Sequence, residues 1–192
     1  MEKLALNLQS QPAIDSYVAG NHLMKYEKDL LSEILISVNA GDYVKMNWFN
    51  SFGDSLRQII MNVYEHRKAL EFGFTEIAFN QYGWFSSPKF IDREDIQLEQ
   101  SEIRLGHGPN GLWAYALSCN YGTAGSSSPL CVFCKKYASR DAALTDALAE
   151  MKAQMTKYLG NADTTNYKQE ILNKTLNAIA AMKNSRVQLS LF

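Results

Sequence analysis

The spacing of apolar side chains predicts that the first part of the chain is helical. Between about Asp15 and Gly73, apolar residues recur at intervals of three and four, which places them on one face of an α-helix. One run ends before Gly41, and the next is capped by Asp54 or Ser55 and ends near Gly73. The apolar positions of the two runs are Leu23, Leu30, Leu31, Ile34, Leu35 and Val38, and then Leu56, Ile59, Ile60, Val63 and Leu70.

Two aromatic segments interrupt or follow these helices. The sequence "DYVKMNWFNSFG", residues 42–53, is rich in large aromatic side chains and predicts a connection that fills the core. The sequence "FGFTEIAFNQYGWFSSPKF", residues 72–90, is punctuated by glycine and proline, which predicts irregular, mostly buried structure.

From residue 96 to residue 137 the pattern changes to that of β-strands. The segment "LWAYALSCNY", residues 112–121, alternates in polarity and so presents one set of side chains to a single face. Turns flank it, and the segments "IQLEQSEIRL" (96–105) and "LCVFCKKY" (130–137) complete a predicted three-stranded antiparallel meander. The residues expected on the shared face are Trp113, Tyr115, Leu117, Cys119 and Tyr121.

Two further helices are expected after the meander. Ser139 is a suitable N-cap for a helix that Gly160 ends, and "NADTT", residues 161–165, would begin the second helix. These helices would form an antiparallel hairpin that partly covers the sheet. The sequence therefore predicts an α+β protein: a mainly helical part (1–90), a meander with two helices (91–185) and a C-terminal peptide tail (186–192). The first two parts could form one continuous domain.

Composition narrows the class of protein. The 192 residues are 46% apolar and 20% charged, as in folded globular proteins. No apolar run approaches the about 20 residues that span a bilayer, and no cationic segment followed by an apolar core opens the chain. The three cysteines are an odd set, which is expected in a reducing compartment, so a cytoplasmic protein without membrane contact is predicted.

The cysteines raise the possibility of a metal site. Cys131 and Cys134 form a C-x-x-C pair, and Cys119 and His107 could supply further zinc ligands. Because residues three apart on a strand point to opposite faces, the strand predicted over residues 130–137 would separate the pair. We therefore expect structural cysteines, with no metal and no cofactor.

An enzyme is the weaker hypothesis. The loop "YGTAGSSSP" joins two strands and lacks the lysine of a phosphate-binding loop, and the acidic stretch "DREDIQLEQSE" lacks the lysine that nuclease sites pair with carboxylates. No catalytic residue is assigned, and a small enzyme or metal-binding protein remains an alternative.

Single-stranded nucleic-acid binding is a second alternative. Aromatic side chains beside cations form the platforms that hold single strands. Residues 135–192 carry nine basic and five acidic side chains, a net charge of +4, whereas residues 1–134 have a net charge of −5. The candidate residues are Trp113, Tyr115, Tyr121, Lys135, Lys136 and Arg140. The two helices that follow would need the same aromatic face for packing. A buried core and an exposed nucleic-acid platform are therefore competing interpretations of this face.

The last five residues, Gln188, Leu189, Ser190, Leu191 and Phe192, read "QLSLF". This pentapeptide resembles the motif Q-L-[S/D]-L-F, by which bacterial replication and repair proteins bind the sliding clamp of DNA polymerase, and it matches at all five positions. Two leucines and a phenylalanine supply apolar anchors, and the glutamine can make oriented hydrogen bonds. The resemblance implies an accessory protein of bacterial or mobile-element DNA metabolism. The competing explanation is that these residues continue the last helix or pack as an edge strand.

The globular body carries a weaker resemblance. The stretch "GLWAYALSCNYGTAGSSSPL", followed by "YASRDAAL", is similar to hairpin-then-helix segments of uncharacterised phage and plasmid proteins.

Overall fold

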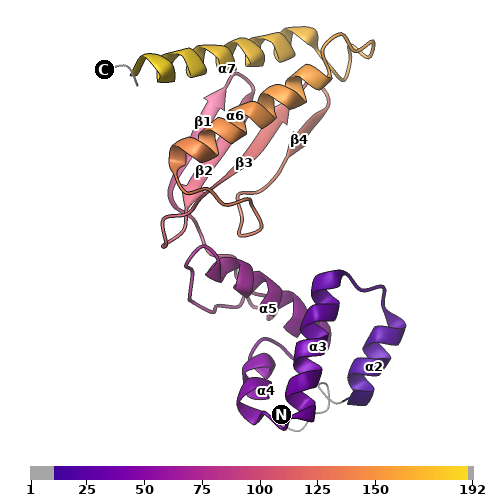
Figure 1. Cartoon of the computed structure of the whole chain (residues 1–192). Coiled ribbons are helices and arrows are strands. Elements are labelled where there is room, and N and C mark those ends of the chain that lie inside the picture. Colours follow the sequence, from indigo (N-terminus) through magenta and orange to yellow (C-terminus); the bar gives the residue numbers. More distant parts are fainter. Residues whose placement is uncertain (1–10, 190–192) are drawn as a thin grey trace. The chain divides into compact units, whose positions relative to one another are not determined.

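The computed structural model describes the backbone of residues 11–189 and the side chains of residues 11–185 (Figure 1). Within these residues it contains six α-helices and one four-stranded antiparallel sheet. The chain forms two compact units, Met1–Glu71 with Thr75–Ser87, and Phe72–Phe74 with Pro88–Phe192. The mixed α and β content agrees with the prediction, and the details differ in the places described below.

The first unit is helical. It contains α2 (Gln11–Gly20), α3 (Lys25–Asn39), α4 (Tyr43–Asn50) and α5 (Leu56–Leu70). The predicted helices correspond to α3 and α5, and Ser55 caps α5 by accepting a hydrogen bond from the Gln58 N–H at 3.2 Å. The segment 42–53, predicted as a connection, contains a short helix, α4, which Asp42 caps through the Lys45 N–H.

The core of this unit is aliphatic and aromatic. Phe49 and Phe52, from the end of α4 and the following turn, are completely buried, so these two side chains fill the core as expected, while Tyr43 is 70% exposed. The remaining buried apolar residues of this cluster are Ile14, Leu23, Leu30, Leu31, Ile34, Leu56, Ile59, Ile60 and Val63.

The buried side-chain amide of Asn62 connects the irregular segment after α5 to the helices by hydrogen bonds. Asn62 is 1% exposed and donates to the Phe52 carbonyl at 2.6 Å and to the Gly83 carbonyl at 2.8 Å. Its oxygen accepts the Phe85 N–H at 2.9 Å. The segment is irregular as predicted, but it is only partly buried, because Tyr82 is 72% exposed and Trp84 is 40% exposed.

The sheet has four strands in the order β1-β2-β3-β4: β1 (Ile91–Leu98), β2 (Ser101–His107), β3 (Trp113–Asn120) and β4 (Gly125–Ser127). The single strand predicted over residues 96–105 is wrong, because the chain reverses between Leu98 and Ser101, which pair directly. Glu99 permits this reversal by adopting φ 58°, a conformation that non-glycine residues seldom take.

The strand predicted over residues 130–137 is also wrong. Cys131 to Cys134 form a turn, closed by a hydrogen bond from the Cys134 N–H to the Cys131 carbonyl at 3.0 Å. From this segment only Tyr137 pairs with the sheet, through an isolated bridge to Trp113. The strand beside β3 is instead β4, in the Gly/Ser-rich stretch that the sequence analysis treated as a loop.

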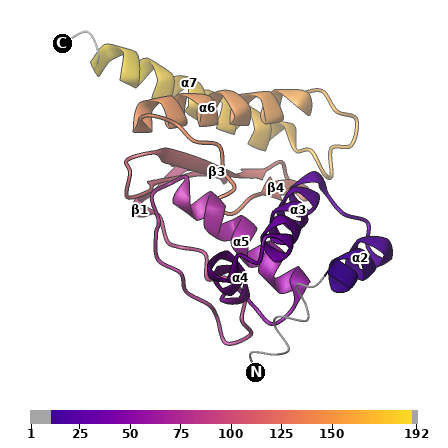
Figure 2. The same ribbon diagram turned by 60° about the horizontal axis from the view of Figure 1, so that its bottom comes forward.

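Two helices cover one face of the sheet (Figure 2). Ser139 caps α6 (Arg140–Lys157), as predicted, and Gly160 with φ 70° follows its end. The next helix, α7 (Gln169–Leu189), begins later than "NADTT" and packs on α6. The core between helices and sheet consists of Leu98, Ile103, Leu105, Leu117, Cys119, Tyr121, Ala143, Leu144, Ala147, Leu148, Met151, Met155, Leu172 and Ile179.

Among the described residues, no helix is both long enough and apolar enough to cross a membrane.

Candidate functional site

The aromatic face of β3 lies under α6. As the alternation predicted, Leu117, Cys119 and Tyr121 share one face and are buried in the core, and Trp113 and Tyr115 are partly buried against the same cluster. Tyr121 is only 4% exposed. The face that could have stacked nucleic-acid bases is therefore used to pack the helix.

A row of polar residues on α6 meets this face. Asp146, Glu150 and Gln154 are four residues apart and so line one side of the helix. The Tyr115 hydroxyl donates to Glu150 Oε2 at 2.5 Å, and the Tyr121 hydroxyl donates to Gln154 Oε1 at 2.7 Å. Gln154 Nε2 in turn donates to Glu150 Oε1 at 3.1 Å. The i, i+4 spacing of this row is visible in the sequence, but these residues were not among the predicted site residues.

Asp146 is the centre of a second group of contacts. It accepts from Lys135 Nζ at 2.9 Å, from the Tyr137 hydroxyl, and from the Tyr115 hydroxyl at 3.5 Å. Hydrogen bonds from Tyr137 and Lys135 lower the pKa of the Asp146 carboxyl. Burial and the hydrogen bond to Glu150 raise the pKa of the Tyr115 hydroxyl far above its ordinary value.

These groups border a pocket of about 290 Å³. Its polar lining comes from Tyr115, Ser128, Lys135, Asp146 and Glu150. Tyr115 pairs with Glu150 and Lys135 pairs with Asp146, so these contacts join α6 to the sheet and to the segment before the helix. These contacts stabilise the packing of α6 at the edge of the pocket.

The basic residues of the nucleic-acid hypothesis are also engaged within the protein. Arg140 contacts Glu94 through Nε at 2.7 Å and Nη2 at 2.6 Å, and Lys135 pairs with Asp146. Lys136 Nζ lies 4.9 Å from the centre of the Phe72 ring. Both the aromatic and the basic candidate residues contact other parts of the same unit. The structure therefore gives the nucleic-acid hypothesis no support.

The four candidate metal ligands do not converge. Cys119 is 3% exposed in the core, and His107 lies at the end of β2, with Nε2 3.0 Å from Asp92 Oδ2. Across the part of the chain that the structure describes, no three His, Cys, Asp or Glu side chains are grouped as metal ligands. Cys131 and Cys134 nevertheless lie in one turn. The prediction that a strand would point their side chains to opposite faces is therefore wrong.

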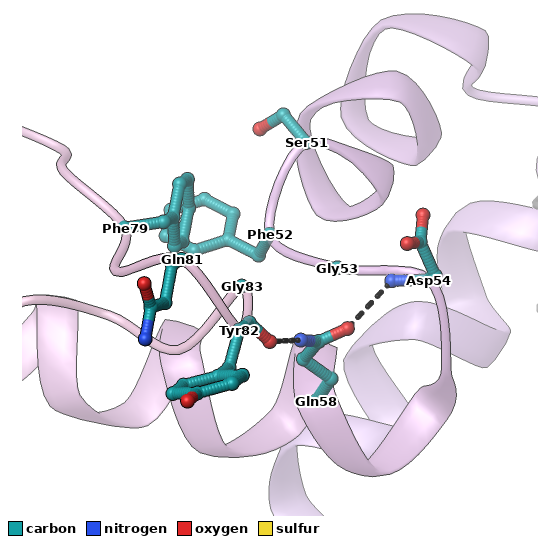
Figure 3. Close-up of a pocket in the computed structure, with 9 residues that line it drawn as sticks. All are labelled: Ser51, Phe52, Gly53, Asp54, Gln58, Phe79, Gln81, Tyr82 and Gly83. Carbon is teal, nitrogen blue, oxygen red and sulfur yellow. Dashed lines mark hydrogen bonds between the residues drawn. The ribbon is translucent and has the colours of Figure 1, made fainter.

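A second pocket, of about 360 Å³, lies in the helical unit at the start of α5 (Figure 3). Gln58 forms part of its wall and is held by two hydrogen bonds, accepting from the Asp54 N–H at 2.9 Å and donating to the Tyr82 carbonyl at 3.1 Å. Gly53 and Gly83 pack so closely on Gln58 that a Cβ atom at either position would lie within 2.6 Å of its side chain. The remaining lining residues are Ser51, Phe52, Asp54, Phe79, Gln81 and Tyr82. Nothing in this lining selects a ligand chemistry.

The C-terminal motif lies almost entirely outside the described residues. The backbone of Gln188 and Leu189 forms the last turn of α7, whereas Ser190, Leu191 and Phe192 fall beyond the described backbone. Among the described side chains of α7, Met182 is the last apolar one that packs on the core, and Asn184 and Ser185 are exposed.

Comparison with known protein families, curated proteins and solved structures found no match to this chain.

Proposed function

We propose that this protein is a non-enzymatic accessory factor of bacterial or mobile-element DNA metabolism that binds the sliding clamp through residues 188–192. The observation that carries the proposal is the complete match of "QLSLF" to the clamp-binding pentapeptide. In a groove, Leu189, Leu191 and Phe192 would provide the buried apolar contacts, and Gln188 would provide the directional ones.

The position of the motif at the end of α7 is compatible with this assignment. Among the described side chains of α7, Met182 is the last apolar one that packs on the core, and Gln188 follows six residues later in the sequence. Because an α-helix rises 1.5 Å per residue, Gln188 lies roughly 9 Å along the helix axis from Met182. Every described residue of the core between the helices and the sheet precedes the motif in the chain, and we propose that the residues of the motif serve a partner.

Binding would require the end of α7 to change conformation. A pentapeptide that presents alternate side chains to a groove is extended, whereas Gln188 and Leu189 are helical here. Unwinding the last turn of a helix breaks few hydrogen bonds, since the final carbonyls have no partner within the helix. This conformational change and the small number of anchors predict roughly micromolar affinity.

The proposal is tested by measuring the affinity of the full chain for a purified bacterial sliding clamp. We expect roughly micromolar binding by the natural sequence and none by Leu191→Ala combined with Phe192→Ala. Ser190→Asp is the matched control, because the motif accepts either serine or aspartate at that position. Equal affinity of the natural chain and the double variant would refute clamp binding through this peptide.

A further inference from the structure

The turn that carries Cys131 and Cys134 has no part in the proposed function. Cys131 to Cys134 form a four-residue β-turn, closed by the hydrogen bond from the Cys134 N–H to the Cys131 carbonyl at 3.0 Å. Such a turn holds its first and last Cα atoms less than about 7 Å apart. That separation overlaps the range of roughly 4.4–6.8 Å found in disulfides.

The sulfur of Cys134 is turned back toward Cys131. Its Sγ accepts a hydrogen bond from the Cys131 N–H at 3.4 Å and donates one to the Pro129 carbonyl at 3.6 Å. Because the Cys131 side chain branches from the Cα next to that N–H, rotation about its Cα–Cβ bond can bring the two sulfurs together. Burial and the neighbouring Cys131 thiol raise the pKa of the Cys134 thiol.

The turn is anchored, and both of its cysteines are partly exposed. Val132, between them, is completely buried, which fixes the turn on the body of the protein. Cys131 and Cys134 are only partly buried, in contrast to Cys119, which is 3% exposed in the core. The pair is therefore more exposed to reagents in solution than the third cysteine.

We propose that Cys131 and Cys134 form a reversible dithiol–disulfide site that is oxidised by low-molecular-weight disulfides such as oxidised glutathione. The described residues offer the pair no third metal ligand, which favours a disulfide over a zinc site. A protein of a reducing compartment would carry the open dithiol and close it when the disulfide pool rises.

The reaction proceeds in two exchanges. The Cys131 thiolate attacks one sulfur of the small disulfide, forming a mixed disulfide and releasing one thiolate. Cys134 then loses its proton and attacks Cys131 Sγ, which forms the Cys131–Cys134 bond and releases the second thiolate. Overall, two protein thiols are oxidised and one small disulfide is reduced to two thiols. Cys134 acts second because its sulfur is hydrogen-bonded inside the turn and burial raises its pKa.

The test uses the full chain, reduced, freed of reductant and exposed to oxidised glutathione. We expect intact-mass and peptide analysis to show the loss of two hydrogen atoms and a Cys131–Cys134 crosslink, with one free thiol remaining and full reversal by dithiothreitol. Cys119→Ala should close in the same way as the natural chain. Cys134→Ser should instead accumulate one glutathione on Cys131.

Three results would overturn the proposal. The first is a stable glutathione adduct on the natural chain without closure, and the second is a covalent dimer through these cysteines. The third is stoichiometric zinc in the protein as purified, with both thiols protected from glutathione until a chelator removes the metal.

Discussion

Arg140 donates two hydrogen bonds to the carboxylate of Glu94, from Nε at 2.7 Å and from Nη2 at 2.6 Å. Glu94 is on β1 and Arg140 is the first residue of α6, so the pair ties the helix to the sheet. Hydrogen bonds from Arg140 also lower the pKa of the Glu94 carboxyl.

Breaking this pair should destabilise the sheet-containing unit slightly. Both side chains are more than one third exposed, so solvent screens the interaction. We expect Glu94→Gln to lower the free energy of unfolding by about 0.5–1 kcal/mol, measured by urea denaturation at neutral pH. Asp95→Asn is the matched control on the same strand, because its partner Arg93 is an exposed neighbour on that strand rather than a residue of α6.

The same pair makes stability depend on pH in a defined direction. The folded pKa of Glu94 lies below its unfolded value, so its contribution is complete above the unfolded pKa and is lost as pH falls through the folded one. The difference in unfolding free energy between the natural chain and Glu94→Gln should therefore shrink as the solution is acidified below about pH 4.5. A difference that stays constant into strong acid would contradict the pairing.

His66 should impose a second pH dependence, on the helical unit. Its ring is 4% exposed among Trp48, Phe52 and Phe85, and neither nitrogen has a hydrogen-bond partner among the described residues. Burial, with a smaller effect of Arg67, lowers the pKa of His66.

The pKa of His66 is lower in the folded state than in the unfolded state. As the pH falls, the unfolded state therefore binds a proton before the folded state does. Stability should be complete above about pH 6.5 and should decrease as pH falls from there through the folded pKa. We expect His66→Leu to remove this slope in urea midpoints measured between neutral and mildly acidic pH. His22→Gln, at an exposed position, is the control and should retain the slope.

The hydrogen bond from Tyr115 to Glu150 should stabilise the packing of α6 on the sheet. Tyr115→Phe removes the donor while keeping the ring, so we expect a loss of about 1 kcal/mol in unfolding free energy. Glu150→Ala should cost a similar amount. Combining the two should cost less than their sum, because the second change has no hydrogen bond left to break. Strict additivity would show that this contact does not contribute to stability.

Trp113 distinguishes a packed face from a nucleic-acid platform. Its ring lies against His107, with centroids 4.9 Å apart, and its backbone exchanges hydrogen bonds with Tyr137. We expect Trp113→Ala to lower the unfolding free energy by about 2–4 kcal/mol. The natural chain should bind oligonucleotides weakly at physiological salt. Tight, salt-sensitive binding that Trp113→Ala abolishes without unfolding the protein would instead favour the platform.

The spacing of apolar residues was sufficient to predict a helix or a strand where one face of that element is buried along its length. The helices α3, α5 and α6 follow their apolar spacing, and Ser55 and Ser139 cap helices where small hydroxyl residues were expected to do so. The alternation of β3 also placed Tyr115 and Tyr121 on the correct face. In each of these helices and strands, many side chains contribute to the same periodic pattern.

Prediction failed where one residue or a tertiary contact determines the backbone. Nothing in "LEQS" resembles a glycine turn, yet Glu99 takes a positive φ and divides the expected strand into two. In "LCVFC", burial of Val132 and the Cys134-to-Cys131 hydrogen bond override the strand propensity of the segment. The partners of Tyr115 and Arg140 lie 35 and 46 residues away in sequence, and no local pattern could identify them.

The most direct test of the central claim measures clamp affinity and melting temperature on one variant that lacks residues 188–192. If the peptide serves the clamp, the truncated chain should lose binding while its melting temperature stays within about 1 °C of that of the natural chain, since no buried side chain is removed. If Leu189, Leu191 and Phe192 belong to the protein's own core, their loss should cost several kcal/mol, about 2–5 for each buried side chain, and lower the melting temperature sharply. A large fall in melting temperature, or clamp binding that survives the truncation, would contradict the account.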